Sequence, residues 1–201
     1  MFLEKDFQVF DIEGLDSRMT AIRANIQPVF QAFWEEFAPK IAREMNEEEF
    51  IHIAQHRRRT TYAPENTWSA ISTSKRGYKA QPHFQLGIWK DYVFMYLSMI
   101  DQPKNEKEIA NCLLGNIHLL KQLPSDFVYS KDHMVSDYFP IDEQLEQAIL
   151  RFRDVKKGEF EIGRVILRND SIWQNEEKAK QKMWETYQTL LPIYKIVYEK
   201  H

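Results

Sequence analysis

The chemistry of this sequence is concentrated between residues 51 and 90, where basic and aromatic side chains are interspersed. This stretch has seven lysines and arginines and one acid, whereas the whole chain has a net charge of −3. Cationic groups bind phosphate oxygens and aromatic rings stack on bases, so the composition is typical of a site for phosphate or nucleic acid. The basic residues are Arg57, Arg58, Arg59, Lys75, Arg76, Lys79 and Lys90.

Residues 56–59 and 75–83 are expected to form the rim of one binding surface. The basic side chains would supply charge, Gly77 would allow close backbone approach, and Trp68 and Tyr78 would stack on the ligand. The leading hypothesis is therefore non-catalytic binding of an anionic ligand, either a phosphorylated small molecule or a nucleic acid. The predicted ligand-binding residues are His56, Arg58, Arg59, Trp68, Lys75, Arg76, Gly77, Tyr78, Lys79 and His83.

Three other hypotheses stay open. An enzyme acting on such a ligand would use His56 or His83 as its acid or base, because imidazole exchanges protons near neutral pH. A homodimeric interaction module would bring the basic stretch against acidic surface, and residues 1–50 and 91–150 each carry a net charge of −6. Alternatively, the arginines lie in a solvated loop and pair with acidic helices, where such pairs contribute little stability.

No metal site and no cofactor are expected. His52 and His56 have the spacing of a helical zinc pair, but residues 50–56 alternate like a strand, in which four residues span roughly 13 Å. Motifs for a nucleophilic serine and for phosphate-binding glycine loops are absent from the sequence. The adjacent Asp132 and His133 are interpreted as a surface pair, because a general base needs a shaped pocket around it.

Helices are predicted at both ends of the chain. Apolar residues recur at steps of three and four between residues 15 and 37, which indicates one long helix. Pro28 predicts a kink or break in that helix, and Pro39 is expected to open a second, shorter helix. The same apolar periodicity predicts a terminal helix over residues 176–200.

Strands are predicted between these helices, because apolar and polar residues alternate there. Expected strands cover residues 7–10, 50–56, 67–73, 82–89, 91–99, 127–130 and 159–167. The 82–89 and 91–99 strands should form a hairpin near Lys90. The sequence therefore predicts a single α+β domain over residues 1–201, with a central, mostly antiparallel sheet and flanking N- and C-terminal helices.

The two faces of this sheet should differ. Alternation places Phe84, Leu86 and Ile88 on one face, which is suited to packing against helices. The opposite face carries His83 and Gln85, together with tyrosine and tryptophan side chains. Either this polar face is open to a ligand, or it is covered by a helix and hydrogen-bonded internally.

Composition indicates a cytoplasmic protein with no membrane partner. Hydrophobic residues make up 43% and charged residues 28%, which is ordinary for a soluble globular protein. One cysteine excludes an internal disulfide, and the acidic first fifteen residues do not resemble a secretory signal. The longest apolar-rich run, residues 92–100, is too short to span a bilayer.

Several strings resemble the YktB-like family of small bacterial proteins of unknown function. They are F-I-H-I-A-Q-H-R-R-R at residues 50–59, N-T-W at 66–68, S-K-R-G-Y-K-A-Q-P-H-F-Q-L-G-I-W at 74–89, F-D-I-E-G-L-D-S-R-M at 10–19, D-H-M at 132–134 and T-L-L-P-I-Y at 189–194. The resemblance covers most of the chain. It implies a compact α+β fold with a central antiparallel sheet, and it implies no activity.

Overall fold

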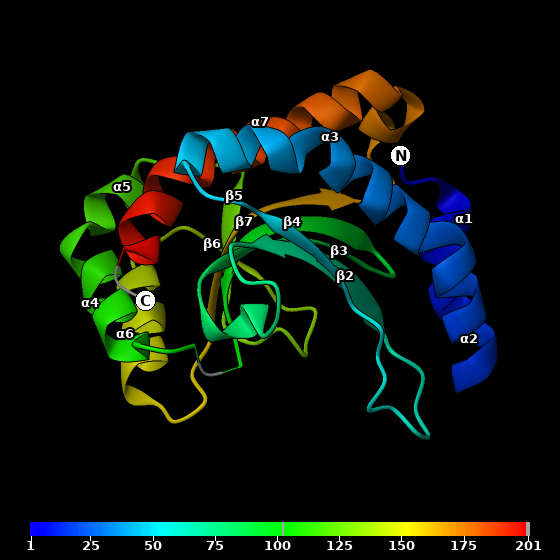
Figure 1. Cartoon of the computed structure of the whole chain (residues 1–201), viewed down its shortest axis with the longest axis horizontal. Helices are drawn as coiled ribbons and strands as arrows, with labels where there is room; N and C mark the ends of the chain where they lie inside the picture. Colours follow the sequence, from blue (N-terminus) through cyan, green and yellow to red (C-terminus); the bar gives the residue numbers. More distant parts are fainter. Residues whose placement is uncertain (102, 200–201) are drawn as a thin grey trace.

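A curved seven-stranded sheet forms the centre of the computed structural model, which describes residues 1–101 and 103–199 (Figure 1). The strands are β1 (Phe50–Ile53), β2 (Asn66–Ser72), β3 (His83–Trp89), β4 (Tyr92–Met99), β5 (Phe127–Ser130), β6 (Phe139–Pro140) and β7 (Phe160–Leu167). Their spatial order is β1-β2-β3-β4-β7-β5-β6, and each pair of neighbours in the described chain is antiparallel. The predicted α+β class with an antiparallel sheet is confirmed.

Helices cover one face of the sheet and one of its sides (Figure 1). The α-helices are α1 (Glu4–Gln8), α2 (Leu15–Ala21), α3 (Gln27–Met45), α4 (Glu106–Gly115), α5 (Ile117–Lys121), α6 (Leu145–Asp154) and α7 (Glu176–Tyr198). Shorter helical turns are η1 (Val9–Asp11), η2 (Ile22–Ile26), η3 (Tyr78–Ala80) and η4 (Ser171–Gln174). Helices α3 and α7 pack across the sheet, as the apolar patterns at the two ends of the chain predict.

The aliphatic face of the sheet forms the core under α3 and α7. The hairpin turns at Lys90, as predicted, and its register sets Leu86 opposite Met95 on this face. Two buried polar contacts fix the helices on the sheet. The indole nitrogen of Trp34 donates to Ser69 Oγ at 2.7 Å, and the Tyr187 hydroxyl donates to the carbonyl of Gln85 at 2.7 Å.

The prolines do not break the N-terminal helix. Helix α2 continues through η2, a π-helical turn, directly into α3, and Gln27 N–H bonds to the carbonyl of Ile22. Pro28 follows this π-helical turn directly, so the bond that its missing N–H cannot make falls where the α-helical bonding pattern is already interrupted. The regular α-helical pattern is thus interrupted just before Gln27, near the position predicted from Pro28, whereas Pro39 lies inside α3 and opens no new helix, so the Pro39 prediction was wrong.

Two predicted strands also differ. Residues 7–10 belong to α1 and η1, because buried Phe7 and Phe10 are spaced for one helical turn rather than for a strand. Strand β1 ends at Ile53, and His56 lies in the following loop with a φ of 49°. The predicted end of the terminal helix at Lys200 lies outside the described residues.

The polar face of the sheet is covered by loops rather than by a helix. Residues 73–82, which include η3, and residues 131–138 lie over it, and Gln85 and Tyr96 beneath them are buried. A smaller apolar cluster of Trp89, Tyr92 and neighbouring side chains fills the hairpin end of this face. Across the described ranges, no helix has the length and apolar composition needed to cross a membrane.

Candidate functional site

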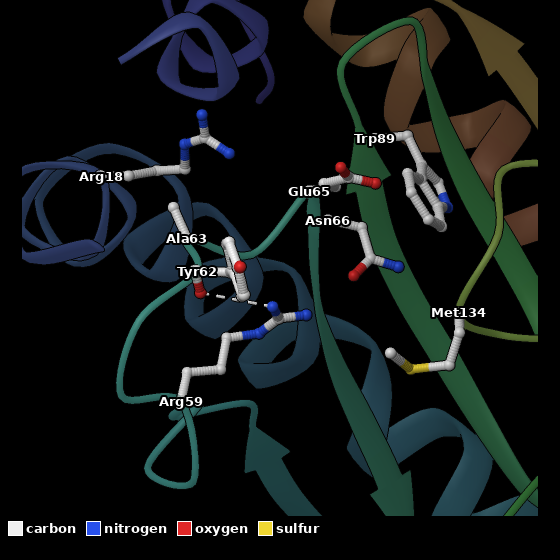
Figure 2. Close-up of a pocket in the computed structure, with 8 residues that line it drawn as sticks. All are labelled: Arg18, Arg59, Tyr62, Ala63, Glu65, Asn66, Trp89 and Met134. Atoms are coloured by element: carbon white, nitrogen blue, oxygen red, sulfur yellow. Dashed lines mark hydrogen bonds between the residues drawn. The ribbon is translucent and has the colours of Figure 1, made fainter. Parts of the chain in front are cut away.

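An open cleft lies where α2, the loop of residues 54–65 and the β3–β4 hairpin meet. Two adjoining hollows, of about 390 and 320 Å³, share Arg18, Glu65 and Trp89 and together form this cleft. Figure 2 shows the larger hollow, with Arg18 on one side and Arg59 and Tyr62 on the loop opposite Trp89. We call the cleft formed by the two hollows the arginine cleft.

Arg18 is held in place by backbone carbonyls. Its Nε donates to the carbonyl of Ile12 at 2.9 Å, and its Nη1 donates to the carbonyl of Pro64 at 3.0 Å. These bonds orient the guanidinium without neutralising it, and no carboxylate of the described chain forms an ion pair with it. Arg18 therefore contributes a half-buried positive charge to the cleft.

Arg59 reaches the same cleft from the loop. Its Nη1 donates to the carbonyl of Tyr62 at 3.4 Å, and it forms no ion pair within the described residues. The Tyr62 ring is 81% exposed, whereas Trp89 is 8% exposed and forms part of the cleft wall. The cleft thus combines two half-buried guanidiniums with two aromatic side chains, the exposed Tyr62 and the buried Trp89.

Two acidic residues, Glu65 and Asp91, also line the arginine cleft. Glu65 and Asp91 are exposed, while Lys90 pairs with Asp11 at 2.6 Å. Solvent and salt screen exposed charges more strongly than partly buried ones. The larger hollow is therefore lined by two guanidiniums and one exposed carboxylate, that of Glu65, and its lining is net positive.

A second group of side chains lies deeper on the polar face, around Trp68 and Tyr78. The Trp68 indole donates to the Tyr78 hydroxyl at 2.9 Å, and Lys79 Nζ lies 5.3 Å from the centre of the Trp68 rings. His52 stacks on Tyr78 at 4.8 Å, and His83 meets the same ring edge-on at 4.9 Å. His52, His83 and the loop of residues 74–79 therefore converge around Tyr78.

His83 and His56 are poorly suited to proton transfer near neutral pH. His83 Nδ1 lies 2.8 Å from the carbonyl of Gln81, and its Nε2 lies 2.9 Å from the side-chain nitrogen of Gln85. This network requires the neutral ring, and burial lowers the pKa of His83 to about 3. Burial, with Arg59 nearby, lowers the pKa of His56 to about 4, and Thr67 Oγ1 contacts its Nε2 at 3.0 Å.

His52 and His56 do not face a common point. His52 Nε2 contacts the carbonyl of Ser74 at 2.9 Å, whereas His56 turns to Thr67 and lies edge-on to Trp68 at 5.5 Å. The extended-strand argument for separating them was wrong, because β1 stops before His56. Their different partners separate them instead.

His133 forms the one histidine–carboxylate pair of the polar face in the described chain. Its Nδ1 lies 2.8 Å from Glu159 Oε2 and 2.9 Å from Oε1, and its ring is edge-on to Trp68 at 5.9 Å. Burial alone would lower the pKa of His133, but the Glu159 carboxylate outweighs burial and raises it. The pair holds the loop of residues 131–138 against the start of β7.

The ten predicted site residues fall into three places. His56, Trp68, Tyr78, Lys79 and His83 converge in the group described above, and Arg59 lines the arginine cleft. The remaining four, Arg58, Lys75, Arg76 and Gly77, are exposed on loops. That any of the ten binds a ligand stays a prediction.

Sequence reasoning missed Arg18, and it set His133 aside as a surface residue. Arg18 lies in the acidic N-terminal segment, and only a contact with a carbonyl 46 residues away brings it to the cleft. Glu159 follows His133 by 26 residues, so spacing alone could not pair them. The available signal was the alternation Glu159–Phe160–Glu161, which places two carboxylates on the polar face.

Comparison with known proteins gives a family over nearly the whole chain. A family described as "Domain of unknown function (DUF1054)" matches residues 2–194. A "UPF0637 protein" of Enterococcus faecalis is 59% identical over 197 residues, which cover 98% of this chain and 97% of the relative. A "UPF0637 protein" of Lactococcus lactis subsp. cremoris is 50% identical and covers 99% of this chain and 100% of the relative. These matches confirm the resemblance drawn from the sequence, and the chain belongs to the DUF1054/UPF0637 family of bacterial proteins of unknown function.

Proposed function

We propose that the protein binds a phosphorylated or otherwise anionic small molecule in the arginine cleft. The main support is that Arg18 and Arg59, from separate elements, line one hollow and form no ion pair with a carboxylate in the described chain. The proposal keeps the function expected from the sequence and moves its centre from the loop of residues 75–79 to the cleft.

The bonding of Arg18 supports this role. A guanidinium fixed by two carbonyls loses little side-chain freedom when it binds an anion, and its unused N–H groups can donate two parallel bonds to a phosphate or carboxylate. Arg59 is tied by one longer bond and can adjust to the ligand. Fixed and adjustable cations together suit an anion that carries more than one charged oxygen.

The aromatic walls suggest that the ligand also has a flat group. Trp89 forms a fixed wall, and the exposed Tyr62 ring stands on the loop that carries Arg59. The hollows fall within the range of about 300–1,000 Å³ that is usual for small-molecule sites. A nucleotide meets both requirements, with phosphate at the arginines and base against an aromatic ring.

The geometry favours the arginine cleft over the other hypotheses. His56 and His83 are neutral and engaged in hydrogen bonds, so neither is suited to act as the acid or base of an enzyme near neutral pH. Arg58 and Arg76 are exposed, as expected for a solvated loop, but neither forms the expected ion pair with an acidic helix in the described chain. The homodimer stays a prediction.

The test is calorimetric titration of nucleoside mono-, di- and triphosphates and inorganic phosphate in about 0.3 M salt, where long-range steering is weak. Arg59→Met should weaken binding about tenfold or more, because a hydrogen bond to a charged group is worth about 1.5–3 kcal/mol. The matched control is Arg58→Met, one residue away but outside the cleft. Equal affinities for wild type and Arg59→Met towards every ligand would refute the site.

A further inference from the structure

Asp132, His133 and Glu159 form a compact set of potential metal ligands beside Trp68. One donor atom from each residue lies within 4.8 Å of the other two. Ligands of one transition-metal ion, bound at about 2.0–2.2 Å, lie at most roughly 4.4 Å apart. Small side-chain rotations would therefore bring all three donors onto a single ion.

Neighbouring backbone groups already orient these donors. Glu159 accepts hydrogen bonds from the N–H groups of Asp101 and His133, both at 2.9 Å. Asp132 Oδ1 accepts from Met134 N–H at 2.8 Å. Outer contacts of this kind hold metal ligands in position and reduce the ordering needed on binding.

Another buried carboxyl group lies close to this set. Glu161 follows Glu159 by two residues on the same side of the chain, and it is only 2% exposed. Its one hydrogen bond in the described chain comes from Ser98 Oγ, a neutral group, at 2.7 Å. Lys79, the nearby cation, lies 3.4 Å from Asp101 instead.

From these observations we infer that Asp132, His133 and Glu159 bind one divalent transition-metal ion. One imidazole nitrogen and two carboxylate oxygens suit Zn²⁺, Mn²⁺, Fe²⁺ or Co²⁺, whereas Ca²⁺ and Mg²⁺ prefer oxygen ligands alone. Three protein ligands leave coordination positions for water or for an anion. The inference departs from the sequence-based expectation of no metal, which considered His52 and His56, and it does not depend on the proposed function.

The full chain, stripped with a chelator and exchanged into metal-free buffer, should be titrated with Zn²⁺ by calorimetry and with Co²⁺ by visible absorbance and tryptophan fluorescence. We expect one ion per chain. Co²⁺ should quench part of the emission, because the His133 ring lies 5.9 Å from that of Trp68. His133→Gln and Glu159→Gln should each weaken binding at least tenfold.

Two further variants keep the test decisive. Asp132→Asn preserves the shape of the side chain and leaves the His133–Glu159 contact intact, so it should fold normally and still lose at least tenfold in affinity. His118→Gln, on α5, is the matched control and should bind like wild type. No binding of Zn²⁺, Co²⁺ or Mn²⁺ at up to millimolar concentration, or equal binding by wild type and Asp132→Asn, would overturn the inference.

Discussion

Individual histidines on the polar face behave differently because of what each ring nitrogen meets. His83 has a carbonyl at one nitrogen and an amide at the other, so its neutral form is satisfied without water. His133 meets a carboxylate, which favours its charged form. The sequence contains six histidines and does not show how their pKa values differ, because the differences arise from tertiary contacts.

The neutral histidines should make the fold sensitive to acid. The pKa of His56 is about 4 in the folded protein, below its ordinary value of 6.5, so the unfolded chain takes up the proton first as pH falls. Stability due to His56 is therefore complete above pH 6.5 and is lost between pH 6.5 and 4. Urea unfolding should show a smaller loss of stability between pH 7 and pH 5 for His56→Gln than for wild type.

An identical loss in the two proteins would mean that His56 titrates normally. Ring-proton shifts in NMR provide a direct check. The His56 signal should stay near its neutral value at pH 5, while that of an ordinary, exposed histidine has moved most of the way to its charged value.

At the scale of elements, strong periodicity made the sheet and the long helices predictable. The hairpin at Lys90 follows from two alternating runs with almost nothing between them. Pro28 follows an interruption of the α-helical pattern, the π-helical turn η2, whereas Pro39 was misleading because α3 continues through it. Residues 7–10 were too few for periodicity to separate a strand from a helical turn.

The contact between β4 and β7 depends on a glycine that no pattern revealed. A Cβ added at Gly163 would lie 1.8 Å from the carbonyl oxygen of Met95, and backbone atoms in a paired strand cannot move away easily. Gly163→Ala should therefore destabilise the protein by about 1–3 kcal/mol or more in denaturant melts.

Gly115 supplies the matched control at the end of α4, where an added Cβ meets nothing within 4 Å. Gly115→Ala should be neutral or slightly stabilising, because alanine favours helix. Similar melts for the two variants would show that the β4–β7 pairing tolerates a methyl group at Gly163.

Across the whole molecule, the candidate sites join segments that are remote in sequence. The arginine cleft takes Arg18 from the acidic N-terminal segment and Arg59 from the basic stretch. The sequence located half of this arrangement, because composition marks a basic stretch but cannot show which of its cations remain unpaired beside a hollow. The group around Trp68 likewise combines β2 with the loops that carry Tyr78 and His133, which only the fold brings together.

The exposed basic loop should then act on the rate of binding rather than on the bound state. Lys75 and Arg76 do not line the cleft, yet they belong to a stretch of net charge +6 in a chain of net charge −3. Such a field raises the association rate of anions, and salt screens it over about 8 Å at physiological ionic strength.

For a ligand identified by the calorimetric titration, stopped-flow measurement of the Lys75→Ala/Arg76→Ala double variant should show slower association at about 0.02 M salt and an unchanged dissociation rate. The difference should vanish above about 0.3 M salt. Faster dissociation at every salt concentration would instead place these two residues in contact with the ligand, as the sequence alone suggested.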